Sequence, residues 1–584
     1  MDLVSSGYCY RLRAVIPTRR HCDGLTLQTV FSSPDRKTEP PYPPIDDIFT
    51  WRTETGRGER EGARLTIEVT AAQERRAPRW LGPTALIALA LAAAALIGER
   101  VWLAASEPLW LDETWTAAIV SAPGAHGFWR EVYLDVNAPL YYVFMRGWSH
   151  LFGLSDLALR IPGLVLAPLT AVLVLFARPD AEPLEVRRGW AALLFFWWGC
   201  GQFLDARCYA MLLALCTLQA LVFARLLRRP STGRAAIWCV ISALAILCQY
   251  YALFIGLAQG LVYVWTHRAR AARTWPALIA LAPAGAWIVH HAPRLAQYGR
   301  PDVAWHQTVD ASSSVALASF TVGAYSPWLT LMVAASLALA MLCPLIPAKA
   351  GNQTLLHRRA PEPEPTTDLA PLWRTVAAGV LALVLVLLSG VLKPTLTARY
   401  LIPVTPSILL GVVLWARATR HGSAALAGLV VAYAAFALNP TAFAAKARLG
   451  APYGSEAASA FLLSHSVTDV VFLWDHPATK IMDPVSLQRV GGVFFRRAGA
   501  QVAVTPMVAA QDEDASLALL NAAHGAHPGL IWIYDRTGRT ASRTHPPHIA
   551  QLDPYWICQT YGDGEIGSIA CYRAGSPGIA AGTS

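Results

Sequence analysis

The chain has 584 residues, of which 54% are hydrophobic and only 15% are charged, with a formal net charge of +10. This composition excludes an ordinary soluble protein, and the length leaves room for many membrane spans plus a separate folded domain. Nucleic-acid binding does not explain the positive charge, because the basic residues gather in short loops between apolar runs. The sequence therefore predicts an α-helical polytopic membrane protein.

Residues 1–79 are polar and contain no apolar run typical of a signal peptide, so we expect a cytoplasmic tail without fixed structure. An apolar body follows over residues 80–445, where roughly 20 apolar residues suffice for each crossing of the bilayer. The long apolar stretch 235–266 is divided at Gln249-Tyr-Tyr251, because otherwise the charge pattern of the later loops inverts. About eleven transmembrane helices are predicted, at 81–104, 157–177, 189–204, 208–227, 235–251, 252–266, 275–291, 326–347, 373–392, 401–416 and 423–443.

Arginine and lysine concentrate in every second loop, from Arg75 and Arg76 before the first span to Arg417 and Arg420 after the tenth. By the positive-inside rule these loops are cytoplasmic. The opposite loops, which include the one around Asp112, then face the extracytoplasmic side of a bacterial inner membrane, as does the C-terminal region.

Residues 446–584 contain no stretch long enough to span a bilayer. Short runs rich in β-forming residues alternate there with helical patterns, which predicts a small extracytoplasmic α/β domain. Cys558 and Cys571 flank a Gly-rich turn, and an oxidising compartment favours a disulfide between them. The loop Trp474-Asp-His-Pro477 lacks the nucleophile or metal spacing of a hydrolase. The expected strands are 470–474, 492–495 and 530–534, and the expected helices are 456–463 and 515–523.

Two adjacent carboxylates, Asp112 and Glu113, stand directly after the first predicted span, in the run Pro108-Leu-Trp-Leu-Asp-Glu-Thr-Trp115. Carboxylates beside a membrane span are costly and so indicate function, although an acidic helix cap is the structural alternative. One carboxylate can take a proton from an acceptor hydroxyl as a general base. The second can orient the first, hold a metal ion or bind a cationic substrate.

Aromatic and cationic residues gather at the same outer side. The segment Asp135-Val-Asn-Ala-Pro-Leu-Tyr-Tyr142 is typical of either a membrane–water interface or a surface for a sugar or isoprenoid chain. Arg160, Arg207 and Arg399 fall at outer span ends, against the charge bias, with Lys393 nearby. Because arginine binds phosphate oxygens bidentately, the group indicates a lipid-linked phosphate, while snorkelling is the alternative for any single arginine.

Five motifs in this order make the chain similar to the GT-C superfamily of integral-membrane glycosyltransferases. Within it, the chain resembles the bacterial branch related to protein O-mannosyltransferases and the lipid A aminoarabinose transferase. It departs from the common family pattern by Asn137-Ala-Pro139 in place of His-Pro-Pro and by Asp205 in place of Glu. The matching motifs span roughly residues 80–445: Trp110-Leu-Asp-Glu-Thr114, Asp135 with Pro139-Leu-Tyr-Tyr142, Phe152-Gly-Leu-Ser-Asp-Leu-Ala-Leu-Arg160-Ile-Pro162, Asp205-Ala-Arg207-Cys-Tyr209 and Ala398-Arg-Tyr-Leu-Ile-Pro403.

The resemblance implies a GT-C fold and transfer of a hexose or pentose, with inversion, from a polyprenyl-phosphate donor to a hydroxyl of a glycan, lipid or protein. It implies Asp112 as the catalytic base, assisted by Glu113, and no cofactor, with a divalent metal ion at Asp112 and Asp135 as the alternative. The substrate-binding residues that it implies are Asp135, Asn137, Tyr141, Arg160, Arg207, Tyr209, Lys393, Arg399 and Tyr400.

A transporter or flippase for a lipid-linked anionic substrate is the alternative function, because it would also have many spans and outward-facing cations. Such a protein should carry charged or helix-breaking residues near the middle of the bilayer, whereas here the polar residues gather at the outer span ends. A non-catalytic assembly protein that acts through its external domain is a third hypothesis.

Overall fold

The chain divides into two compact units in the computed structural model, Met1–Gly82 and Pro83–Ser584. In the first unit, β1 (Leu12–Arg13), β2 (Phe49–Arg52) and β3 (Thr66–Val69) form an antiparallel sheet of order β1-β3-β2. Strands are not expected there from the sequence, and the remainder of the predicted tail lies outside the described residues. The structure describes residues 12–13, 49–52, 66–69, 83–177, 183–197, 205–300, 302–303, 309–323, 368–393, 395–418, 422–438, 454–508, 513–523, 529–535, 547, 549–552, 554–562 and 566–574.

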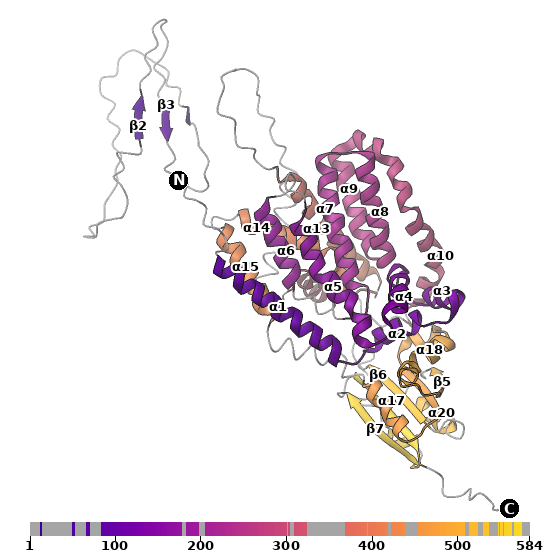
Figure 1. Ribbon diagram of the computed structural model, residues 1–584. Helices are drawn as coiled ribbons and strands as arrows, with labels where there is room; N and C mark the ends of the chain where they lie inside the picture. Colours follow the sequence, from indigo (N-terminus) through magenta and orange to yellow (C-terminus); the bar gives the residue numbers. More distant parts are fainter. Residues whose placement is uncertain are drawn as a thin grey trace, which may run out of the picture. The chain divides into compact units, whose positions relative to one another are not determined.

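The second unit consists of a helical body over residues 83–438 and a sheet domain over residues 454–574 (Figure 1). Three short helices, α2, α3 and α4, separate the long helices α1 and α5 and lie on the side of the body that carries the sheet domain. The helices of the body are α1 (Pro83–Ser106), α2 (Leu111–Val120), α3 (Gly124–Leu134), α4 (Leu140–Phe152), α5 (Asp156–Leu175), α6 (Leu184–Phe196), α7 (Tyr209–Arg228), α8 (Thr232–Cys248), α9 (Ala252–His267), η3 (Arg268–Leu281), α10 (Ala282–Tyr298), α11 (Ala311–Phe320), α13 (Ala370–Leu392), η4 (Ala398–Leu401), α14 (Thr405–Ala418) and α15 (Gly422–Ala437).

Four helices among the described residues are long and apolar enough to cross a membrane, within α1, α5, α7 and α13. Shorter apolar segments occur in α8, α11, α14 and α15. The division predicted at residues 249–251 is confirmed, because α8 ends at Cys248 and α9 begins at Ala252. The span predicted at 326–347 lies outside the described residues, as do residues 198–204 of the third span.

Buried polar side chains join neighbouring helices of the body. Gln219 on α7 donates to the Ser242 hydroxyl on α8 at 2.7 Å, and Trp238 on α8 donates to Gln259 on α9 at 2.6 Å. Trp190 on α6 donates to the carbonyl of Pro406 on α14 at 2.9 Å. In an apolar environment such bonds replace contacts with water and fix which helix faces meet.

The sheet domain is a mixed five-stranded sheet of order β5-β4-β6-β8-β7, with β4 parallel to β5 and β6 and with β8 antiparallel to β6 and β7. The predicted disulfide is confirmed: it joins Cys558 on β7 to Cys571 on β8. The elements are α17 (Ser455–Ser464), β4 (Asp469–Asp475), η6 (Pro477–Ile481), α18 (Pro484–Gly491), α19 (Val493–Arg497), β5 (Ala503–Val508), α20 (Glu513–Ala523), β6 (Gly529–Asp535), η8 (Ile549–Gln551), β7 (Trp556–Gly562) and β8 (Ile566–Arg573).

The central strands of this sheet are buried on both faces, which explains their continuous apolar sequence. Val471 and Leu473 of β4 pack with Leu517 of α20, whereas the alternate residue Phe472 faces α18. The strand predicted at 492–495 is wrong, because Val493–Arg497 form α19 directly after α18. Short apolar runs do not distinguish a strand from a buried helix, and all three apolar residues here are buried. The predicted fold class, a helical apolar body followed by an α/β domain, is confirmed for the described residues.

Candidate functional site

The site is built around α2, which begins after the extended segment at Trp110. Asp112 and Glu113 lie in its first turn, where negative charge is favourable beside the unpaired backbone N–H groups. Glu113 turns back along the helix, and its Oε2 accepts a hydrogen bond from the Trp110 backbone N–H at 3.2 Å. The two neighbouring carboxylates therefore point to different surroundings.

Glu113 forms a buried ion pair with Arg160 of α5. The guanidinium donates from Nε to Oε1 at 2.8 Å and from Nη2 to Oε2 at 2.5 Å, and the two side chains are 0% and 5% exposed. The Ala206 backbone N–H also donates to Glu113 Oε1, at 2.7 Å. The remaining Arg160 donors bind backbone carbonyls at the end of α1 and just after it, those of Ala104, Glu107 and Pro108. Glu113 thus ties α2 to α5 and to the turn before α7.

Replacing Glu113 with Gln should destabilise the fold as well as impair the site. The Arg160 guanidinium would stay buried beside a neutral amide, which costs about 3–5 kcal/mol. Thermal unfolding in detergent measures the effect, with Asp112→Asn as the control because the Asp112 side chain is 25% exposed. Glu113→Gln should unfold at the lower temperature, and equal unfolding temperatures would contradict a structural role for this ion pair.

Asp112 faces a partly accessible cluster instead. Its Oδ2 lies 2.9 Å from Nη1 of Arg399, and Arg207 donates to the Asp112 backbone carbonyl at 3.1 Å. The Arg399 guanidinium also lies over the rings of Trp110 and Tyr209, at 5.6 and 5.8 Å from their centroids. Asp112 is therefore a partly exposed carboxylate beside two guanidinium groups.

The charges around Asp112 decide its protonation. Burial raises the pKa of the Asp112 carboxyl, but Arg399 and then Arg207 lower it by more, so that the pKa lies below its ordinary value. Burial, followed by the charge of Glu113, instead raises the pKa of Asp205 well above its ordinary range. The surroundings of Asp112 therefore favour its ionised form, whereas those of Asp205 favour its protonated form.

Asp135 is connected to Asp112 through Tyr142 and Arg207. Its Oδ2 accepts from the Tyr142 hydroxyl at 2.6 Å and from the Asn137 side-chain amide at 2.9 Å. The Tyr142 oxygen in turn accepts from Arg207 at 3.3 Å. Since burial raises the pKa of Tyr142 well above its ordinary value, the phenol stays protonated and remains a donor. This network fixes the orientation of Arg207.

Tyr142 was not singled out from the sequence, which pointed to its neighbour Tyr141. Both are buried, and their rings meet edge to face at 6.1 Å. Only the structure distinguishes them, because it shows which hydroxyl reaches Asp135.

Two residues predicted near the last motif, Tyr400 and Lys393, have different surroundings in the structure. Tyr400 stacks on Tyr251 at 4.9 Å, and the Tyr251 hydroxyl lies 3.0 Å from that of Thr395. Tyr400, whose ring stacks on that of Tyr251, directly follows Arg399 in the chain. Lys393 directly follows α13 and is exposed, and its part in the site stays a prediction.

No group of three or more His, Cys, Asp and Glu side chains is arranged for a metal ion in the part of the chain that the structure describes. The Asp112 carboxylate faces Arg399, and Asp135 accepts from Tyr142 and Asn137. These contacts engage Oδ2 of each of the two carboxylates.

The sequence matches no family profile and no curated protein. Among solved structures, the chain is similar to ArnT from Cupriavidus metallidurans in the apo state, with 12% identity and a TM-score of 0.49 over 84% of this chain and 98% of that one. It is also similar to the same protein bound to undecaprenyl phosphate, with 12% identity and a TM-score of 0.47 over 85% of this chain and 99% of that one. At this level of similarity, the function of the present chain is inferred from its own site.

Proposed function

We propose that this protein is a membrane glycosyltransferase that moves a sugar from a polyprenyl-phosphate donor to an acceptor hydroxyl, on the extracytoplasmic side of a bacterial inner membrane. One observation carries the proposal: the partly exposed Asp112 lies 2.9 Å from Arg399, with Arg207 beside it, at the ends of apolar helices. A base and a phosphate-binding group thus meet where a lipid headgroup can arrive. The motif resemblance of the sequence supports the same donor class.

The reaction is a single displacement. Asp112 takes the proton of the acceptor hydroxyl while the oxygen of that hydroxyl forms a bond to the anomeric carbon of the sugar. The bond between that carbon and the phosphate oxygen breaks, and the polyprenyl phosphate leaves with the electron pair. Attack opposite to the leaving group inverts the anomeric centre. Arg399 and Arg207 stabilise the negative charge that develops on the phosphate.

Glu113 acts as a positioning residue in this scheme rather than as a second base. Its oxygens already accept hydrogen bonds from Arg160, Ala206 and Trp110, so that none faces the acceptor. Arg160 is engaged in the same way and is a structural cation. Phosphate recognition therefore falls to Arg399 and Arg207, with Asp135, Asn137 and Tyr142 holding Arg207 and lining the sugar side.

The placement of charge also favours this function over transport. The carboxylates and guanidinium groups of the site lie in α2, directly after α3, in the turn before α7, in η4 or at the start of α5. A transporter would instead place them midway along its spanning helices. The polar contacts between Gln219 and Ser242 and between Trp238 and Gln259 are buried neutral bonds between helices, without net charge.

Binding of a lipid phosphate tests the proposal. Purified protein should unfold at a higher temperature with a polyprenyl phosphate present, because a ligand that binds only the folded state stabilises it. The neutral polyprenol of equal chain length is the control and should give a much smaller shift. Equal stabilisation by both lipids would show that the apolar chain alone is recognised and would contradict a phosphate site.

A further inference from the structure

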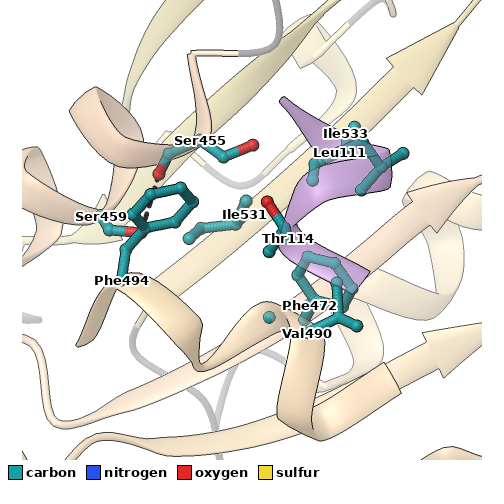
Figure 2. A pocket seen from close by; sticks show the side chains of 10 residues that line it. Leu111, Thr114, Ser455, Ser459, Phe472, Val490, Phe494, Ile531 and Ile533 are labelled. Carbon is teal, nitrogen blue, oxygen red and sulfur yellow. Dashed lines mark hydrogen bonds between the residues drawn. The ribbon is translucent and has the colours of Figure 1, made fainter. Parts of the chain in front are cut away.

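The sheet domain packs against two parts of the candidate site. One part is α2: a small cavity at this junction is lined by Leu111 and Thr114 of α2, by Phe472 of β4 and by further side chains of the domain (Figure 2). Figure 2 shows the side chains of Leu111 and Thr114 pointing toward the strands. The other part is the end of α3, which leads into the loop with Asp135. The helix that carries Asp112 and the loop that carries Asp135 therefore share one neighbour.

Polar contacts join the second half of α3 to the start of α18. Arg130 of α3 pairs with Asp483, the N-cap of α18, at 2.6 Å. The next residue, Glu131, is buried and accepts a hydrogen bond from the Ser486 hydroxyl at 2.5 Å. These contacts hold the sheet domain against α3 about one helical turn before Asp135.

Arg294 of α10 joins the end of α3 to the same domain. It is 6% exposed, and its guanidinium donates from Nε to the Leu134 carbonyl and from Nη1 to the Ile481 carbonyl of η6, both at 3.0 Å. Nη1 also donates to Gln297 at 2.6 Å, and Nη2 donates to the Tyr298 hydroxyl at 3.2 Å. Burial of a guanidinium is costly unless its donors are bound. These four hydrogen bonds therefore make it possible to bury Arg294 between α3, α10 and η6.

The loop after α3 is held on both sides of Asp135. The Tyr298 hydroxyl donates to the Leu134 carbonyl at 3.1 Å, so this carbonyl accepts from Tyr298 as well as from Arg294. On the other side of Asp135, Val136 packs against the buried Tyr298 and against Ala478 of η6. Both neighbours of Asp135 in the chain are thus fixed by α10 and the sheet domain.

His291 of α10 holds the carbonyl that precedes Leu134. Its Nε2 donates to the Tyr133 carbonyl at 2.8 Å, because a carbonyl oxygen can only accept. Nδ1 of the neutral ring then accepts from the Tyr250 hydroxyl at 2.6 Å. The last carbonyls of a helix have no partner within that helix. Two buried side chains of α10 therefore bind the last two carbonyls of α3.

We propose that Arg294 is a positioning residue of the candidate active site: by holding the end of α3 between α10 and η6, it places Asp135. Asp135 in turn accepts from Tyr142, whose oxygen accepts from Arg207, so the path from Arg294 to Arg207 consists of hydrogen bonds and the chain itself. The inference rests on the proposed function and adds a residue to that site. It gives the sheet domain a part in the reaction, since Ile481 supplies one of the carbonyls that Arg294 connects.

Arg294→Lys tests this role with the positive charge kept. A lysine ammonium lacks the planar fork of donors by which arginine binds several acceptors. We expect kcat for the release of polyprenyl phosphate from a sugar-labelled donor to fall about 10- to 100-fold, the size of effect that a small misplacement of a catalytic group produces. The KM of the lipid donor should change little, because Arg399 keeps its contacts.

Tyr298→Phe is the milder second variant. It keeps the ring that packs against Val136 and removes only the hydroxyl that Arg294 and the Leu134 carbonyl share. It should lower kcat in the same way but by less than Arg294→Lys. Because it leaves the buried guanidinium in place, it tests the same path if Arg294→Lys does not fold.

A double-variant cycle separates positioning from a general loss of stability. Tyr142→Phe breaks the link between Asp135 and Arg207 directly. If Arg294 acts through this link, Arg294→Lys added to Tyr142→Phe should lower kcat by clearly less than the product of the two single losses. A combined loss equal to that product would show independent effects and would overturn the inference.

Arg187→Lys is the matched control. Arg187 of α6 is also buried, and its Nη1 donates to the carbonyls of Leu175 and Ala177, at and just after the end of α5, both at 2.7 Å. It thus holds the end of a helix in the same manner as Arg294, but without a contact to the loop with Asp135. Its replacement should lower the unfolding temperature as Arg294→Lys does and leave kcat unchanged.

Amide hydrogen exchange gives a readout that does not require turnover. Arg294→Lys should speed exchange in the peptides that cover residues 131–139 and 477–487 of the purified full chain, because both segments lose a hydrogen bond to the same side chain. Arg187→Lys should leave exchange in both peptides unchanged.

The outcomes are distinct. A lower kcat, a combined loss below the product and faster exchange in both segments support the inference. A folded Arg294→Lys protein with wild-type kcat overturns it, and so does an equal loss of kcat in Arg187→Lys. If the wild type transfers no sugar, the proposed function fails, while hydrogen exchange still decides whether Arg294 holds the loop with Asp135.

Discussion

Asp112→Asn should lower sugar transfer by about 10²–10⁴-fold, the range expected when a general base is removed. An amide has nearly the same shape as the carboxylate but cannot accept the proton of the acceptor hydroxyl. The effect should fall on turnover, because the phosphate groups of donor and product still meet Arg399 and Arg207. Release of free polyprenyl phosphate from a labelled donor, with reconstituted protein, measures this rate.

The unfolding temperature of Asp112→Asn shows whether a loss of activity comes from a loss of fold. Asp112 is a quarter exposed and pairs with one arginine, so its replacement should change the unfolding temperature little. A folded Asp112→Asn protein with wild-type turnover would remove Asp112 from the chemistry. Asp205 is less suited to this role, since burial and the charge of Glu113 raise the pKa of Asp205 and so favour its protonated form.

The two partners of the Asp112–Arg399 pair should have opposite effects on lipid-phosphate binding. Arg399→Ala removes a charged donor to the phosphate and should weaken binding by about 10- to 100-fold. Asp112→Asn removes the carboxylate that competes for the same guanidinium at 2.9 Å, and should tighten binding by about fivefold, equivalent to about 1 kcal/mol. Titration of both variants with a polyprenyl phosphate in detergent measures the two constants.

Arg417→Ala is the matched control for this experiment. Arg417 lies in the last turn of α14, at the other end of that helix from η4, and its Nε lies 4.0 Å from Glu185. Its removal should leave lipid binding unchanged. If Asp112→Asn weakened binding as Arg399→Ala does, Asp112 would itself bind the lipid headgroup. That result would contradict the idea that the phosphate replaces Asp112 as the partner of the Arg399 guanidinium.

The sequence predicts the outline of this site because its chemistry follows simple spacing rules. Asp112 and Glu113 are recognised as acidic residues directly after an apolar helix, and Arg399 as a cation at the outer end of another. In the structure Nη1 of Arg399 lies 2.9 Å from Oδ2 of Asp112, although the two residues are far apart along the chain. The division between α8 and α9 was also predictable, because charge in the following loops constrains the number of crossings.

The remainder depends on tertiary contacts that a single sequence does not encode locally. Two adjacent carboxylates look equivalent in the sequence, and only packing shows that Glu113 is enclosed by Arg160 while Asp112 is not. The choice between Tyr141 and Tyr142 depends on the rotation of α4, and the strand expected at 492–495 is a helix because its apolar run is too short to set a period. His476 stood in a loop without any catalytic motif, and its stacking on Trp474, whose ring meets Trp115 of α2, is seen only in the structure.

The most direct test of the account is the fate of a sugar-labelled polyprenyl phosphate in membrane vesicles that contain this protein and its native acceptors. The wild type should move the label from the lipid to a non-lipid-phosphate product and release polyprenyl phosphate in equal amount, while vesicles with Asp112→Asn should retain the label on the donor. Label that leaves the donor at the same rate in both preparations, or that crosses the membrane while still attached to its lipid, would contradict the account.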